Sequence, residues 1–134
     1  FGISGPLKIK KELLNLGFTN EEIDKYLNKD FNEKIDKIIQ KKIKNNNKLN
    51  EYNLKINITN YLTNLGYPKE MFAEYLNDIK VDNKVIIKKD IEKLIKKYQK
   101  KYQGKELYYF IKRKLYQKGY REEEIGDVLI ENIL

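Results

Sequence analysis

IKKELLNLGFTNEEIDKYL, residues 9–27, is the stretch that decides the fold, because the chain contains three related copies of it. The second copy, residues 58–76, reads ITNYLTNLGYPKEMFAEYL, and the third, residues 111–129, reads IKRKLYQKGYREEEIGDVL. The copies align without a gap, and their glycines, Gly17, Gly66 and Gly119, stand 49 and 53 residues apart. Recurrence at such a period is typical of helical repeats, in which one unit alone cannot bury its apolar face.

The first half of each copy predicts an α-helix that stops at the glycine. Ile9, Leu13 and Leu16 have the spacing of one helical face. Gly17 follows, and glycine readily adopts the left-handed conformation that ends many helices. Phe18 then supplies an apolar side chain that can pack back on the helix just ended.

The second half predicts another helix directly after this turn. Thr19 and Glu22 have the spacing of a capping box. Ile23, Tyr26 and Leu27 would form the inner face of this helix. Each copy is therefore predicted to be a helical hairpin with a tight glycine turn.

Between the copies lie further apolar-periodic stretches, and no alternating strand pattern is present. The sequence predicts an all-α fold of tandem three-helix repeats, eight helices in a 3 + 3 + 2 arrangement, forming an elongated, curved array. We expect the 134 residues to form a single helical-repeat region with units at about 5–48, 49–103 and 104–134. The helices are expected near residues 7–16, 20–28, 31–43, 52–65, 68–76, 83–102, 106–117 and 121–132, with Gly104 ending the sixth.

Composition excludes several kinds of site. The chain has no cysteine and no histidine, which removes disulfides, thiolate metal ligands and imidazole catalysis. No nucleotide-binding glycine motif occurs, and the acidic run 122–124 is better explained by the helix dipole than by a metal. We expect no enzyme activity, no catalytic residue, no metal and no cofactor.

The sequence also predicts the cellular location and oligomeric state of the protein. No apolar run approaches the ~18 residues of a membrane span, and the start lacks a signal-peptide pattern. We expect a cytoplasmic monomer. Because Phe1 stands where an initiator methionine would be, we also expect a fragment of a longer protein.

The net charge of +8 is distributed unevenly along the chain. Residues 31–48 carry six lysines against two acids, and residues 84–105 carry nine against two. The second helices are acidic: residues 121–134 hold one arginine against five acids. If equivalent helices stack, one face becomes basic and another acidic.

The densest basic segment is the candidate binding face for a filament or for DNA. Exposed lysines are ordinary, and about half of them would be no more than solvated surface. Tyr98, Tyr102, Tyr108, Tyr109 and Tyr116 interleave with the basic residues and could stack on bases, although at helical spacing several would be core. The candidate residues are Lys88, Lys89, Lys93, Lys96, Lys97, Lys100, Lys101, Lys112, Arg113 and Lys114.

The three copies resemble the tandem three-helix repeat of the RecX family, regulators of the recombinase RecA. GPLKIKKELLNLGFTNEEIDKYL, residues 5–27, is similar to a family repeat, and KLYQKGYREEEIGDVL, within residues 104–129, is similar to the final one. The second copy departs from the pattern, with Glu51 and Tyr52 where the first has its leading Gly-Pro. The family's N-terminal portion has no counterpart in this sequence.

The resemblance implies binding along the groove of the RecA filament on single-stranded DNA, and modulation, usually inhibition, of filament assembly, ATP hydrolysis and strand exchange. Such a protein acts in the cytoplasm in homologous recombination, DNA repair and the SOS response. Two alternatives stay open. One is a helical-repeat protein that binds single- or double-stranded DNA directly, with no RecA partner. The other is a helical scaffold for an unrelated acidic protein.

Overall fold

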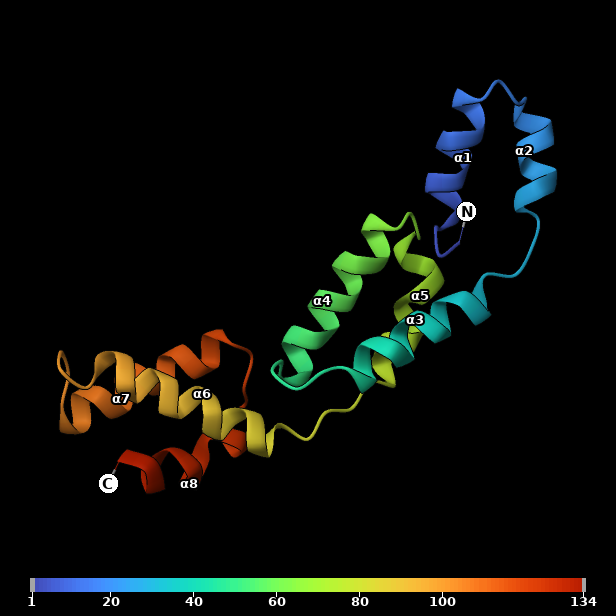
Figure 1. Ribbon diagram of the computed structural model, residues 1–134. Helices are drawn as coiled ribbons and strands as arrows, with labels where there is room; N and C mark the ends of the chain where they lie inside the picture. Colours follow the sequence, from blue (N-terminus) through green and yellow to red (C-terminus); the bar gives the residue numbers. More distant parts are fainter. Residues whose placement is uncertain (1, 134) are drawn as a thin grey trace. The chain divides into compact units, whose positions relative to one another are not determined.

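A computed structural model describes residues 2–133, which contain eight α-helices and no β-strand (Figure 1). This confirms the all-α prediction. The structure also shows no helix long and apolar enough to cross a membrane among these residues. The helices are α1 (Pro6–Asn15), α2 (Asn20–Leu27), α3 (Asn32–Lys44), α4 (Glu51–Asn64), α5 (Lys69–Asn77), α6 (Asn83–Tyr98), α7 (Gly104–Gln117) and α8 (Glu122–Ile133).

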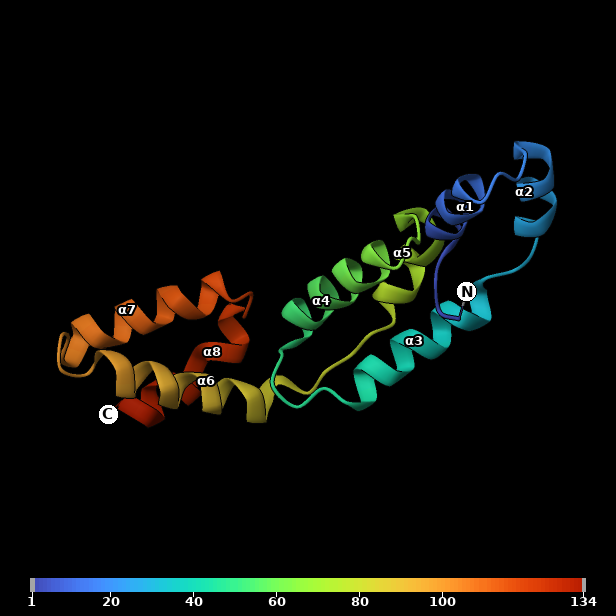
Figure 2. The same ribbon diagram turned by 45° about the horizontal axis from the view of Figure 1, so that its top comes forward.

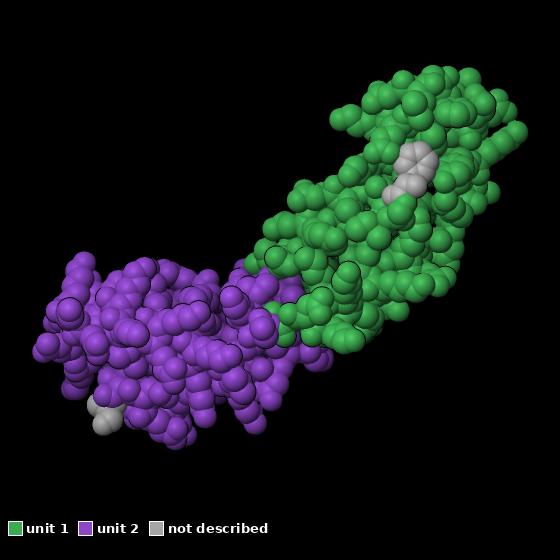
Figure 3. Space-filling model, in the orientation of Figure 1, with its two compact units in different colours: residues 1–46, 55–79 green, residues 47–54, 80–134 purple. Residues whose placement is uncertain are grey.

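The chain divides into two compact units, which Figure 3 shows in different colours. Unit 1 comprises residues up to 46 together with 55–79, and unit 2 comprises residues 47–54 and 80–134. In unit 1, α1 packs against α2 and α3 packs against α5; in unit 2, α6, α7 and α8 pack against one another. The repeat bounds drawn from the sequence follow a different division and stay a prediction.

The repeated apolar positions supply the core of both units. Ile9, Ile58 and Ile111 are fully buried. The position six residues after each glycine is buried as well, with Ile23, Phe72 and Ile125 at 1% exposure or less. Burying side chains of this size is the main favourable term in folding, so the motif positions hold the helices together.

The predicted turn and cap are both present. Gly17, Gly66 and Gly119 have φ values of 93°, 96° and 92°, the left-handed conformation that favours glycine. The Thr19 hydroxyl accepts a hydrogen bond from the backbone N–H of Glu22, and the Glu22 carboxylate accepts one from the backbone N–H of Thr19. This reciprocal pair confirms the capping box at the start of α2.

Two details of the predicted hairpin are wrong. Leu16 lies beyond the last residue of α1 and is 72% exposed, and Tyr26 on α2 is 47% exposed. Only Ile23 of the predicted inner face of α2 is fully buried. The physical reason is that α3, the helix that follows, packs against α5 and borders a groove with α4, and so does not cover Leu16 and Tyr26 of the α1–α2 hairpin (Figures 1 and 2).

The predicted end of the sixth helix is also wrong. α6 ends at Tyr98, where the backbone N–H groups of Lys101 and Tyr102 both donate to the Tyr98 carbonyl and tighten the chain into a turn. Gln103 is extended and precedes α7, so Gly104 begins a helix instead of ending one. Glycine is common at both helix boundaries, and only the preceding turn decides between them.

Candidate basic interface

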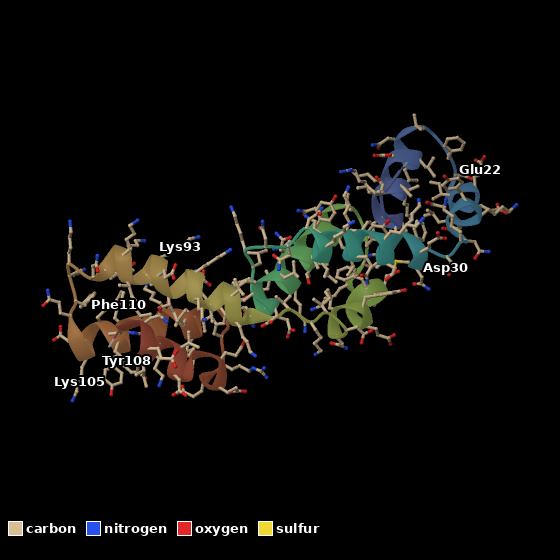
Figure 4. All side chains as sticks on the ribbon, turned by 60° about the horizontal axis from the view of Figure 1, so that its bottom comes forward. Glu22, Asp30, Lys93, Lys105, Tyr108 and Phe110 are labelled. Carbon is tan, nitrogen blue, oxygen red and sulfur yellow. The ribbon has the colours of Figure 1, made fainter. Side chains whose placement is uncertain are left out.

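One side of α6 carries a stripe of lysines that faces solvent. Its members recur at three- and four-residue intervals, opposite the buried Ile87 and Ile91. All are exposed, and Figure 4 shows Lys93 pointing away from the neighbouring helix α7. The lysine stripe consists of Lys89, Lys93, Lys96, Lys97 and Lys100, the last lying just beyond the helix.

Three aromatic rings gather beside this stripe, where α6 ends and α7 begins. The Phe110 ring stacks on Tyr102, with centroids 4.5 Å apart, and meets Tyr98 edge-on at 4.6 Å. All three rings are half-buried against the core of unit 2. Such contacts stabilise the end of the helix pair beyond the area they bury.

Four of the predicted basic residues surround these rings. The ammonium of Lys97 lies 5.3 Å from the Tyr98 centroid, and that of Lys101 lies 5.5 Å from the Tyr102 centroid. The Arg113 guanidinium and the Lys114 ammonium lie 5.9 and 5.5 Å from the Phe110 centroid. These are cation–π distances, and they place four positive charges around one aromatic patch.

Two predicted residues face acidic groups of unit 2. Lys112 lies 2.9 Å from a carboxylate oxygen of Glu122, and this hydrogen bond raises the pKa of Lys112. Its ammonium is also 5.8 Å from the Tyr108 ring, on the opposite edge of unit 2 from Lys93 in Figure 4. Lys88 lines a hollow that also contains three glutamates, Glu123, Glu124 and Glu131. The ten predicted residues therefore do not share one face.

The five tyrosines divide between core and surface. Tyr98, Tyr102 and Tyr108 are half-buried against the core of unit 2. Tyr109 and Tyr116 are 63% and 45% exposed. Only these last two present a large part of the ring to a partner.

A second basic feature, in unit 1, was missed by the sequence analysis. Side chains of α3 and α4 enclose a groove of about 410 Å³ with the buried Ile38 among the residues that line it. The Lys42 ammonium lies 4.0 Å from the centroid of the Tyr61 ring at its side. The excess of lysine over residues 31–48 was the available signal, but the contribution of Tyr61 depends on folding. The lysine groove is lined by Ile3, Lys34, Lys37, Ile38, Lys41, Lys42, Asn45 and Tyr61.

The acidic residues of α8 are explained by the fold around them. Glu122, Glu123 and Glu124 occupy its first turn, where carboxylates favourably meet the helix dipole. Burial acts to raise the pKa of Glu124, but hydrogen bonds from Asn83 and Arg121 outweigh it and hold that pKa below its usual range. Within residues 2–133 the structure places no three acidic side chains close enough together to hold a metal ion.

Comparison of the chain with protein-family models, with curated proteins and with solved structures found no match.

Proposed function

We propose that this chain is a modulator of the RecA recombinase, specifically an inhibitor, and that it binds along the RecA filament on single-stranded DNA. The proposal rests on the threefold motif, whose first and third copies resemble the RecX repeat. The proposal includes the tandem arrangement, in which the three copies act as repeats of one elongated, curved array.

The lysine stripe supplies the electrostatic part of the proposal. Four exposed ammonium groups on one side of α6, with that of Lys100 just beyond its end, match a partner whose surface is acidic or lined with phosphates. Because the stripe is solvent-exposed, we expect its attraction to weaken as salt rises. The buried motif positions hold the helices in place and need not touch the partner.

The experiment is ATP hydrolysis by RecA on single-stranded DNA with this chain titrated in. The parent chain is expected to lower the rate, and a variant with Lys93, Lys96, Lys97 and Lys100 changed to glutamate is expected to have lost this effect. A matched control changes the same amount of charge at four other exposed lysines, Lys10, Lys11, Lys69 and Lys80. If both variants inhibit as the parent does, the stripe is not the docking surface.

Direct binding to nucleic acid is the second candidate, and the aromatic patch favours it. The four cations around Tyr98, Tyr102 and Phe110 could contact the phosphates of a single strand, and the exposed rings of Tyr109 and Tyr116 could stack on its bases. This function predicts affinity for bare DNA that falls steeply with salt, with no need for RecA. Fluorescence anisotropy of a labelled oligonucleotide, read at several salt concentrations, separates it from filament binding.

A further inference from the structure

The same helix-end contact occurs once in each unit. In unit 1 the start of α1 meets the end of α4: the N–H of Gly5 donates to the Leu65 carbonyl at 2.7 Å, and the N–H of Leu7 to the Gly66 carbonyl at 3.0 Å. In unit 2 the start of α4 meets the end of α7. There the side-chain amides of Asn50 and Asn53 donate to the Lys118 carbonyl at 2.9 and 3.1 Å.

These contacts use equivalent positions of the repeated motif. Leu65 and Lys118 both directly precede the glycine of their copies. At a helix end the last carbonyls have no partner within the helix, so a donor from outside satisfies them. The end of a motif helix is thus an acceptor site, occupied in the second copy and in the third.

A basic helix, or the residue that directly precedes it, contacts the aromatic residue of the same two copies. Tyr67, after Gly66, is 1% exposed and meets the ring of Phe31, the residue before α3, edge-on at 6.1 Å. Tyr120, after Gly119, is 2% exposed and donates to Asp90 of α6 at 2.6 Å. The helices α3 and α6 are alike, each with a buried row of isoleucines and many lysines.

In the first copy the structure, over residues 2–133, gives the equivalent side chains neither a donor group at the helix end nor a contact from a basic helix. Phe18, the equivalent of Tyr67 and Tyr120, is 45% exposed, and Leu16 before its glycine is 72% exposed. Leu13 is partly exposed, although its equivalents Leu62 and Leu115 are fully buried. We call Leu13, Leu14, Leu16 and Phe18 the open hairpin face.

Charge indicates what would cover this face. In the covered copies an acidic second helix packs against a basic one, α5 against α3 and α8 against α6. The helix α2 belongs to the same class, since residues 19–30 carry four acids against two lysines. Glu21 and Asp24 line a hollow on its surface next to Leu27.

We propose that the open hairpin face binds a basic amphipathic helix of a partner protein, with an isoleucine-rich side and lysines opposite, as in α3 and α6. The apolar side would cover Phe18 and Leu13, and its lysines would lie near the acidic residues of α2. The proposal does not depend on the RecA function, because the residues concerned lie on the α1–α2 hairpin and not on the lysine stripe.

The test uses a fluorescent synthetic peptide with the sequence of residues 82–102, which includes α6, titrated with the full chain. Saturable binding is expected, with a loss of at least tenfold in affinity in the Phe18→Glu variant. Tyr109→Glu is the matched control, because Tyr109 is even more exposed than Phe18 but lies on α7, and it should bind as the parent does. Circular dichroism of both variants checks that they fold.

Further arms of the test decide the nature of the binding. A peptide of the same composition with its isoleucines out of register should not bind, and E21Q with D24N should weaken binding several-fold. NMR signals of Leu13 and Leu16 should shift when the peptide is added. Equal binding by the shuffled peptide, or by Phe18→Glu, overturns the proposal. So does a dimer of the chain alone that Phe18→Glu dissociates, because a second copy would then cover the face.

Discussion

The phenol of Tyr120 donates a hydrogen bond to the carboxylate of Asp90 with an O–O distance of 2.6 Å, which ties the third copy of the motif to α6. Both groups are shielded from water, with the Tyr120 residue 2% exposed and the Asp90 side chain 14% exposed. A second partner, the Lys118 ammonium, lies 3.6 Å from the other oxygen of Asp90. Within unit 2, the shielded Asp90 carboxylate of α6 therefore interacts with both a tyrosine hydroxyl and a lysine ammonium from the end of α7 and the turn after it.

Tyr120→Phe is expected to lower the free energy of unfolding by about 1–3 kcal/mol, because the shielded carboxylate of Asp90 loses its hydrogen bond from the tyrosine and keeps only the more distant Lys118. Urea denaturation measures the change. Tyr109→Phe removes the same hydroxyl from a ring that is 63% exposed and should change stability by less than about 0.5 kcal/mol. Equal effects of the two substitutions would show that the bond to Asp90 contributes nothing.

Stability is expected to fall at alkaline pH. Burial, together with the hydrogen bond and negative charge of Asp90, raises the pKa of Tyr120 in the folded chain, and burial raises the pKa of Tyr67. The folded state therefore holds these protons more tightly than the unfolded state does. The contribution is fully present below the unfolded pKa of ~10 and is lost as pH rises through the folded pKa. Denaturation at a series of pH values, compared between parent and Tyr120→Phe, should show a smaller alkaline loss in the variant; the same loss in both would contradict this.

Thr19→Ala is expected to destabilise the chain by about 1 kcal/mol, because the start of α2 loses its cap. The substitution also has a local readout. Hydrogen bonds from the backbone N–H and the hydroxyl of Thr19 lower the pKa of Glu22, and loss of the hydroxyl should raise that pKa in an NMR titration. Thr63→Ala, at an exposed position in α4, should cost nothing. An unchanged Glu22 pKa would contradict the assigned cap.

Gly66→Ala is expected to destabilise the chain more than Gly17→Ala. Both glycines are left-handed, so either substitution costs roughly 1–2 kcal/mol of backbone strain. At Gly66 the added Cβ would also lie 2.6 Å from the backbone nitrogen and the Cβ of Lys8, whereas at Gly17 nothing lies within 4 Å. Thermal denaturation of the two variants measures the difference, and equal losses would show that α1 does not dock on the end of α4.

The local structure was predictable because it depends on neighbouring residues. The Thr19 cap, the left-handed Gly17 and the burial of Ile9 and Ile23 follow from spacing within one copy. The boundary at Gly104 was not predictable, since glycine suits either end of a helix and the turn after Tyr98 decided the matter.

The candidate interface was predicted only in part, because a helix sequence gives its solvent side but not its neighbours. The periodicity of residues 83–98 places the lysine stripe opposite Ile91, as the structure has it. It does not indicate that Lys112 pairs with Glu122 or that Lys42 lies over Tyr61. Phe18 is the clearest case, since identical motif positions are buried in two copies and exposed in the first through tertiary packing alone.

The most direct test of the proposed function is co-sedimentation of the chain with RecA filaments assembled on single-stranded DNA at low salt. We expect the chain to sediment with the filaments, to be released as salt rises, and to stay in the supernatant when Lys93, Lys96, Lys97 and Lys100 are changed to glutamate. Bare single-stranded DNA and RecA without DNA serve as the reference samples. No association with the filament at low salt would contradict the account, and equal association with bare DNA would replace it by direct nucleic-acid binding.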